Sequence, residues 1–243
     1  MEAIMCDKTT APGVDLVLCV DTTGAMSAFG YELRRASPMI YPAFVREALH
    51  RGMAIGEVRL SFNMFKDYAV DEEPMTMSAP FSLPEEQGDA ECFLQMEYDN
   101  FKGGGGDLPE SCLEAVFLAM IREPMEHQPY RRVIGVYTDS DCHRPGDEWC
   151  VAACQYPPGM PMDFSEFQRA LDGEPFSSED VAVLPVRITG FAPESFGEKY
   201  GLCLLYSLPE VKIQQTNVCP GLCRLEAEDI VSDLVDAFFN RFD

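Results

Sequence analysis

Residues 14–21 read VDLVLCVD, a nearly continuous apolar run that ends in Asp21. Apolar runs of this length are typical of parallel strands that are buried on both faces of a sheet. Residues 131–139, RRVIGVYTD, repeat the pattern and end in Asp139. The sequence therefore predicts at least two buried strands, each followed directly by a carboxylate.

Helical segments alternate with the strands. Residues 25–49 predict a long helix that Pro38 and Pro42 should kink or split, because proline lacks the amide donor of the helix. Residues 82–85, SLPE, resemble a capping box that opens a helix to about residue 98. Apolar side chains recur at helical spacing in two later segments, residues 112–121 and 230–239.

This alternation predicts an α/β fold, a doubly wound and mostly parallel central sheet flanked by helices. The other expected elements are strands at residues 58–68, 181–189 and 211–215, and a helix at 198–206. The chain shows no internal repeat, low-complexity tract or linker. We therefore expect a single domain over residues 1–243, with its core at about 14–240.

Composition narrows the classes of partner. The 243 residues are 47% hydrophobic, which is enough for a substantial core, and carry 41 acidic against 18 basic side chains, a formal charge of −23. Such a charge disfavours nucleic acid and anionic lipid, and favours cations and basic surfaces. No signal peptide or membrane span is apparent, so we expect a cytoplasmic protein whose ten cysteines are reduced.

Three loops offer oxygen ligands for a metal ion. Ligands bind beyond the carboxyl ends of strands in open α/β sheets, so Asp21 and Asp139 should share one crevice if their strands are neighbours. Residues 21–26, DTTGAM, and 103–110, GGGGDLPE, add hydroxyl and carboxylate groups. Such ligands suit Mg²⁺, with Mn²⁺ or Ca²⁺ as alternatives.

The three loops resemble the von Willebrand factor A superfamily and its metal-ion-dependent adhesion site. That resemblance implies that Asp21 and Thr23 supply the first ligand loop and Asp139 the third. The segment DLPE also resembles a loop of the A-like domains in integrin β subunits, where the glutamate binds metal, which implies a ligand role for Glu110. Asp107 is then a neighbouring or directly ligating group.

A narrower resemblance is to compact bacterial A-domain proteins, some of them associated with tellurite-resistance or phage-conflict loci. It is carried by FKDY at residues 65–68, by LPEE at 83–86, and by Thr138 and Asp139 followed by His143. The resemblance implies a cytoplasmic adaptor or regulatory component of a bacterial stress or defence complex. Its metal would bind an acidic side chain of a partner protein, without catalysis.

One departure from the family pattern leaves alternatives open. The first loop of the family normally carries a serine where this chain has Ala25, which lacks a side-chain oxygen. A metal-free scaffold that binds partners is therefore one alternative. A metal-assisted hydrolase is another, with His143 and Asp67 as its candidate bases, although Asp67 also reads as a structural carboxylate at a strand end.

Zinc is a separate alternative for the cysteines. Cys142, His143, Cys150 and Cys154 lie close together in the sequence, and a Cys-x₃-Cys spacing falls within the range of zinc sites. A second pair with this spacing comprises Cys219 and Cys223. The competing interpretation is that these cysteines are reduced and serve as small packing residues.

Overall fold

The computed structural model describes residues 11–99, 104, 109–123, 125, 130–138, 140, 142–171, 187–191 and 226–239. Within these ranges six strands form one sheet in the order β3-β2-β1-β5-β6, and β4 also pairs with β2. The strands are β1 (Gly13–Asp21), β2 (Val58–Phe65), β3 (Met75–Met77), β4 (Phe81–Leu83), β5 (Tyr130–Tyr137) and β6 (Arg187–Phe191).

Strand β1 lies at the centre of the sheet. It pairs in parallel with β2 on one side and with β5 on the other, and β6 continues in parallel beyond β5. The short strands β3 and β4 are antiparallel to β2. Asp21 is in register with Phe65, and Val20 with Tyr137, so β1, β2 and β5 end at the same edge of the sheet. The predicted mostly parallel α/β sheet is confirmed.

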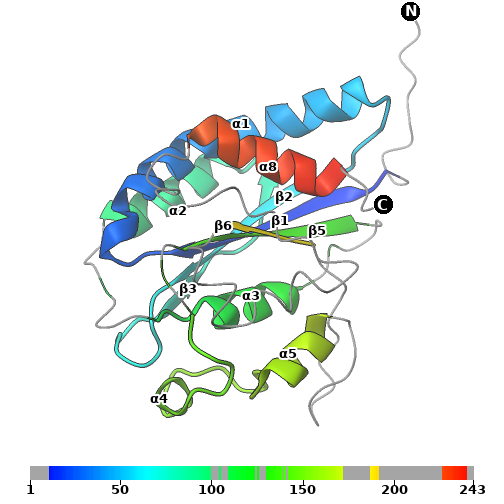
Figure 1. Ribbon diagram of the computed structural model, residues 1–243. Coiled ribbons are helices and arrows are strands. Elements are labelled where there is room, and N and C mark those ends of the chain that lie inside the picture. The colour runs from blue at the N-terminus through cyan, green and yellow to red at the C-terminus, as the bar shows by residue number, and fades with distance from the viewer. Residues whose placement is uncertain are drawn as a thin grey trace, which may run out of the picture.

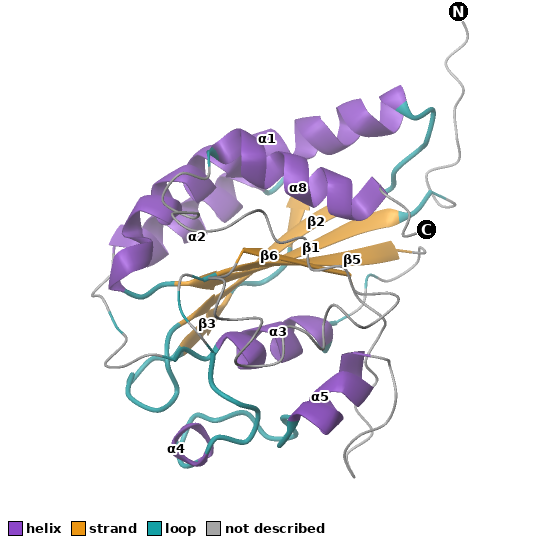
Figure 2. Cartoon of the chain, viewed as in Figure 1, coloured by secondary structure: helices purple, strands orange, loops and turns teal. Residues whose placement is uncertain are grey.

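Helices cover both faces of the sheet (Figures 1 and 2). One face carries α1 (Ser27–His50), α2 (Gln87–Asp99) and α8 (Ala227–Phe239), and a 3₁₀ turn, η1 (Gly24–Met26), leads into α1. The other face carries α3 (Cys112–Met120), α4 (Glu148–Val151) and α5 (Phe164–Leu171). Each face has its own apolar cluster, because alternate side chains of β1 point to opposite sides.

The predicted apolar stripe of the last helix is confirmed. Ile230 and Leu234 of α8 are fully buried, and Phe238 packs edge-on against Phe44 of α1, with ring centroids 5.5 Å apart. These contacts hold α1 and α8 together over the same face of the sheet.

Two details of the helices differ from the sequence prediction. Helix α1 runs unbroken through Pro38 and Pro42. Both prolines are exposed and one turn apart, where a helix that curves around its core can tolerate lost solvent-side hydrogen bonds. The predicted capping box is wrong, because Ser82 lies in β4 and pairs with Arg59, and α2 begins only at Gln87.

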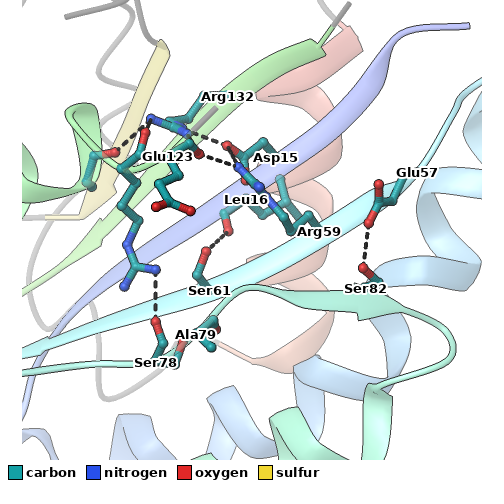
Figure 3. Close-up of polar contacts among 12 residues, drawn as sticks. Asp15, Leu16, Glu57, Arg59, Ser61, Ser78, Ala79, Ser82, Glu123 and Arg132 are labelled. Carbon is teal, nitrogen blue, oxygen red and sulfur yellow. Dashed lines mark hydrogen bonds and ion pairs between the residues drawn. The ribbon is translucent and has the colours of Figure 1, made fainter. Parts of the chain in front are cut away.

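A buried ion network holds the other end of β1 (Figure 3). Asp15 is 1% exposed and accepts two hydrogen bonds from Arg59, both at 2.9 Å, and one from Arg132 at 2.7 Å. Both guanidinium groups also donate to the carbonyl oxygen of Glu123. The network joins β1, β2 and β5 at the end of the sheet away from Asp21. The apolar run of residues 14–21 did not predict this network.

The remaining expected elements lie partly outside the described residues. Strand β6 covers Arg187–Phe191, and residues 181–186 of the strand predicted there lie outside the described residues. Pro185, the predicted helix at 198–206 and the predicted strand at 211–215 fall in ranges that the structure does not describe. None of the described helices is long and apolar enough to cross a membrane.

Candidate metal centre

Asp21, the last residue of β1, is fully buried at the edge where the parallel strands end. Its Oδ1 accepts hydrogen bonds from the amide of Thr23 at 2.8 Å and from the hydroxyl of Thr23 at 2.7 Å. The chain turns sharply here because the Thr22 amide and hydroxyl both donate to the carbonyl of Phe65 on β2. Carboxylate and threonine hydroxyl are thereby held side by side.

The second oxygen of Asp21 is bound from the neighbouring strand. Thr138, the residue after β5, donates its hydroxyl to Asp21 Oδ2 at 2.8 Å and accepts a bond from the Ser140 amide at 3.2 Å. The ends of β1 and β5 therefore bring the side chains of Asp21, Thr23 and Thr138 together, whereas the predicted crevice shared with Asp139 stays a prediction, because Asp139 lies outside the described residues. Thr138 was not among the predicted ligands, although it precedes the predicted Asp139.

Glu110 approaches this crevice from the segment before α3. It is 2% exposed, and its carbonyl accepts a hydrogen bond from the His143 amide at 3.0 Å in a short parallel bridge. The next residue, Ser111, donates its amide to the carbonyl of Lys66 and accepts from the amide of Tyr68 through its hydroxyl. These bonds tie the Glu110 backbone to the loops after β2 and β5.

The carboxyl group of Glu110 is electrostatically strained. Burial raises the pKa of Glu110 to about 9, with further contributions from the carboxylates of Asp21, Asp67 and Asp71. Its Oε2 is buried and has no hydrogen-bond partner within the described part of the chain. A divalent cation beside Glu110 and Asp21 would relieve the repulsion and satisfy this oxygen.

Gly104, the one described residue of the glycine run, lies close to the loop after β2. A side chain at Gly104 would lie 2.7 Å from Cδ of Lys66 and 2.9 Å from Oδ1 of Asp71. A β-carbon at this position would therefore require the side chains of Lys66 and Asp71 to move.

Of the predicted ligands, the structure brings Asp21, Thr23 and Glu110 to one edge of the sheet. Asp107 and Asp139 lie outside the described residues. The set of described groups comprises carboxylate and hydroxyl oxygens, which are the ligands that Mg²⁺, Mn²⁺ and Ca²⁺ prefer. Such a set can hold a cation and orient an anionic group on it.

A different cluster lies next to this crevice. Asp67 follows β2 and is fully buried, and its Oδ1 lies 3.0 Å from Nε2 of His143 and 4.0 Å from Sγ of Cys150. Burial alone lowers the pKa of His143, but its contacts with Asp67 and Cys150 outweigh burial and raise the pKa to about 11. Asp67 therefore favours the protonated form of His143.

The predicted cysteine-rich zinc site is only partly assembled. His143 and Cys150 meet, whereas Cys154 is exposed and the buried Cys142 thiol contacts Cys112. Cys219 and Cys223 lie outside the described residues. The hydrolase alternative named Asp67 and His143 together, but no local pattern indicated that Cys150 would join them.

Comparison with known proteins gives no family assignment. No protein-family model and no curated protein matches the chain. Among solved structures, proximal thread matrix protein 1 from the mussel byssus matches in two crystal forms, at 12% and 13% identity with TM-scores of 0.44 and 0.43. The pilus adhesin SpaC from Lactobacillus rhamnosus GG matches at 10% identity with a TM-score of 0.47.

These matches cover 93–94% of this chain but only 48%, 48% and 31% of the other chains. The chain thus spans less than half the length of each of these proteins. Similarity at this level supports no conclusion about activity or partners.

Proposed function

We propose that this chain is a metal-dependent protein-interaction module of the von Willebrand factor A type. The crevice beyond β1 and β5 binds Mg²⁺, or Mn²⁺ or Ca²⁺ in its place, through Asp21, Thr23 and Glu110. Asp107 and Asp139 are proposed as further ligands from the sequence resemblance. The ion keeps one coordination position for an acidic side chain of a partner protein.

The observation that carries this proposal is the environment of Glu110. A carboxylate that is buried beside Asp21, with one oxygen unpartnered in the described residues, is costly unless a cation or proton neutralises it. The hydrogen bonds from Thr23 and Thr138 fix both oxygens of Asp21, as groups around a metal ligand commonly do.

The net charge of −23 shapes the choice of partner. A negative field attracts cations to the crevice but repels an acidic protein surface. We therefore propose a partner that presents one acidic side chain within a basic surrounding surface. From the sequence resemblance we propose that this partner belongs to a cytoplasmic bacterial stress or defence complex.

An affinity-capture experiment tests the interaction. Wild-type protein and the Asp21→Asn variant are each used as bait, in Mg²⁺ and in EDTA, and retained proteins are identified by mass spectrometry. The proposal predicts a protein retained only by the wild type in Mg²⁺. Retention of the same proteins in all four conditions would instead support a metal-free scaffold, the alternative raised by Ala25.

A further inference from the structure

The cluster of Asp67, His143 and Cys150 has the composition of a transition-metal site. One carboxylate oxygen, one imidazole nitrogen and one thiol sulfur all lie within 4.8 Å of one another, and all three residues are buried. They come from three segments, the loop after β2, the loop after β5 and helix α4. Apolar packing alone does not explain why a carboxylate, an imidazole and a thiol from three segments lie together in the interior.

The surroundings of the histidine also resemble those of a metal ligand. His143 Nδ1 lies 3.7 Å from Oδ2 of Asp147. Metal-binding histidines commonly direct the nitrogen away from the metal toward a carboxylate, which fixes the ring. Asp147 itself is fixed, because its Oδ1 accepts a hydrogen bond from the Trp149 amide at the start of α4.

Two buried polar atoms at the cluster have no hydrogen-bond partner among the described residues. His143 Nε2 is one, since its contact with Asp67 Oδ1 lacks hydrogen-bond alignment despite the 3.0 Å distance. The other is Oε2 of Glu114, whose Oε1 accepts a hydrogen bond from Tyr156 at 3.2 Å. Burial raises the pKa of Glu114 to about 7. The charge of nearby His143 lowers this pKa, and that of Asp67 raises it.

We propose that Asp67 Oδ1, His143 Nε2 and Cys150 Sγ bind one Zn²⁺ ion, with Glu114 beside it. Zinc takes nitrogen at about 2.0 Å, oxygen at about 2.0–2.2 Å and sulfur at about 2.3 Å, so its tetrahedral ligands stand roughly 3.3–3.8 Å apart. The separations of 3.0 Å and 4.0 Å bracket that range. The three ligand atoms as they stand lie within 4.8 Å of one another, so side-chain shifts would bring them to zinc distances.

The chemistry of this ligand set favours zinc over magnesium. Thiolate and imidazole are the ligands that zinc accepts and that Mg²⁺ avoids. On binding, the Cys150 thiol and the His143 imidazolium each lose a proton to solvent, and the ion's two positive charges are balanced by Asp67 and the new thiolate. This site shares no ligand with the proposed magnesium crevice, so the zinc proposal does not depend on magnesium binding.

Cobalt is a direct probe, because a Co²⁺–thiolate bond gives a charge-transfer band that oxygen ligands do not. Chelator-treated, reduced full-length protein is titrated with Co²⁺ in excess Mg²⁺, and Zn²⁺ is then added. We expect one equivalent of Co²⁺ to produce the charge-transfer band with tetrahedral visible bands, and Zn²⁺ to remove both. No charge-transfer band at saturating Co²⁺ would overturn the proposal.

Variants locate the ligand. Cys150→Ser should abolish the band, whereas Cys154→Ser, at the exposed cysteine of the same segment, should leave it unchanged. Asp147→Ala should weaken Zn²⁺ binding by about 10–100-fold, as loss of an outer carboxylate does. A band that survives Cys150→Ser would overturn the assignment.

Two further controls separate folding and the neighbouring crevice from the zinc site. Circular dichroism of the metal-free variants establishes that each is folded, and His143→Gln provides a second ligand variant if Cys150→Ser is not. Asp21→Asn should leave the cobalt spectrum intact, since it belongs to the crevice. If Asp21→Asn abolishes the thiolate band, the two sites are one and the proposal of a separate site is wrong.

Discussion

Thr138 and Asp21 join the ends of two neighbouring strands through a hydrogen bond of 2.8 Å from the threonine hydroxyl to the aspartate Oδ2. The bond leaves Asp21 held from both sides, since Thr23 binds the other oxygen. A carboxylate with both oxygens fixed cannot rotate to follow a ligand. The Asp21 carboxylate is therefore already oriented before a cation binds, as long as Thr23 and Thr138 keep their positions.

Replacing Thr138 by valine should weaken metal binding without unfolding the protein. The substitution keeps the shape of the side chain but removes the hydroxyl that orients Asp21. We expect Mg²⁺ affinity to fall by about 10–100-fold, the usual effect of losing a group that orients a ligand. Calorimetry measures the change. Thr22→Val is the matched control, since Thr22 binds the Phe65 carbonyl and not Asp21, and an equal loss there would argue against the specific role of Thr138.

Replacing Ala25 by serine should strengthen metal binding. Ala25 stands where the family pattern has a serine, and the added hydroxyl would supply an oxygen ligand to the first loop. We expect Mg²⁺ affinity to rise by about tenfold, which corresponds to about 1.4 kcal/mol. The comparison of dissociation constants for wild type and Ala25→Ser is the test. Unchanged affinity in a folded variant would mean that residue 25 does not face the ion.

The metal-free protein should lose stability as the pH rises. The pKa of Glu110 is about 9 in the fold, where burial and neighbouring carboxylates raise it, against about 4.3 in an unfolded chain. Between these values the native state holds a proton that the unfolded state releases, so the free energy of unfolding declines with pH across this window. For this group the decline levels off about one pH unit above 9.

Urea unfolding in EDTA at several pH values measures this decline. The Glu110→Gln variant should show a shallower slope, because it cannot ionise at this position. His143 and Glu114 contribute in the same direction, since their pKa values are also raised, so the wild type keeps part of its slope in the variant. Identical slopes for wild type and Glu110→Gln would show that Glu110 is not strained in the fold.

Removing Asp15 should destabilise the protein strongly. Asp15→Ala leaves Arg132, whose side chain is 2% exposed, as a buried charge without its carboxylate. Removing one partner of a buried ion pair lowers the free energy of unfolding by about 3–5 kcal/mol. Urea unfolding should register this loss, whereas Glu47→Ala, which removes a surface pair with Arg51, should change stability far less. Similar losses in both variants would contradict a structural role for the Asp15 network.

The sheet and its ends were predictable because they follow from local patterns. The apolar runs of β1 and β5 predicted buried parallel strands, and the spacing of apolar residues in α8 predicted its buried face. Asp21, Thr23 and Glu110 were predicted as ligands because short motifs carry them, and the structure brings the three to one edge of the sheet. In each case the signal lies within a few neighbouring residues.

The features that were missed depend on contacts between distant segments. Asp15 interrupts an apolar run, and only the positions of Arg59 and Arg132 on neighbouring strands make it a network. Asp67 and His143 were named together as candidate bases, but Cys150 joins them only because the loop after β2 packs against the segment after β5 that carries His143 and Cys150. No local pattern in the sequence indicates these pairings.

Titration of EDTA-treated protein with Mg²⁺ by calorimetry decides whether the crevice binds a metal ion. It compares the wild type with a double variant carrying Asp21→Asn and Glu110→Gln, after circular dichroism establishes that both are folded. We predict saturable binding of one ion to the wild type and none to the double variant. Equal heats from both proteins, or no heat from Mg²⁺, Mn²⁺ or Ca²⁺ in the wild type, would contradict a metal-dependent module.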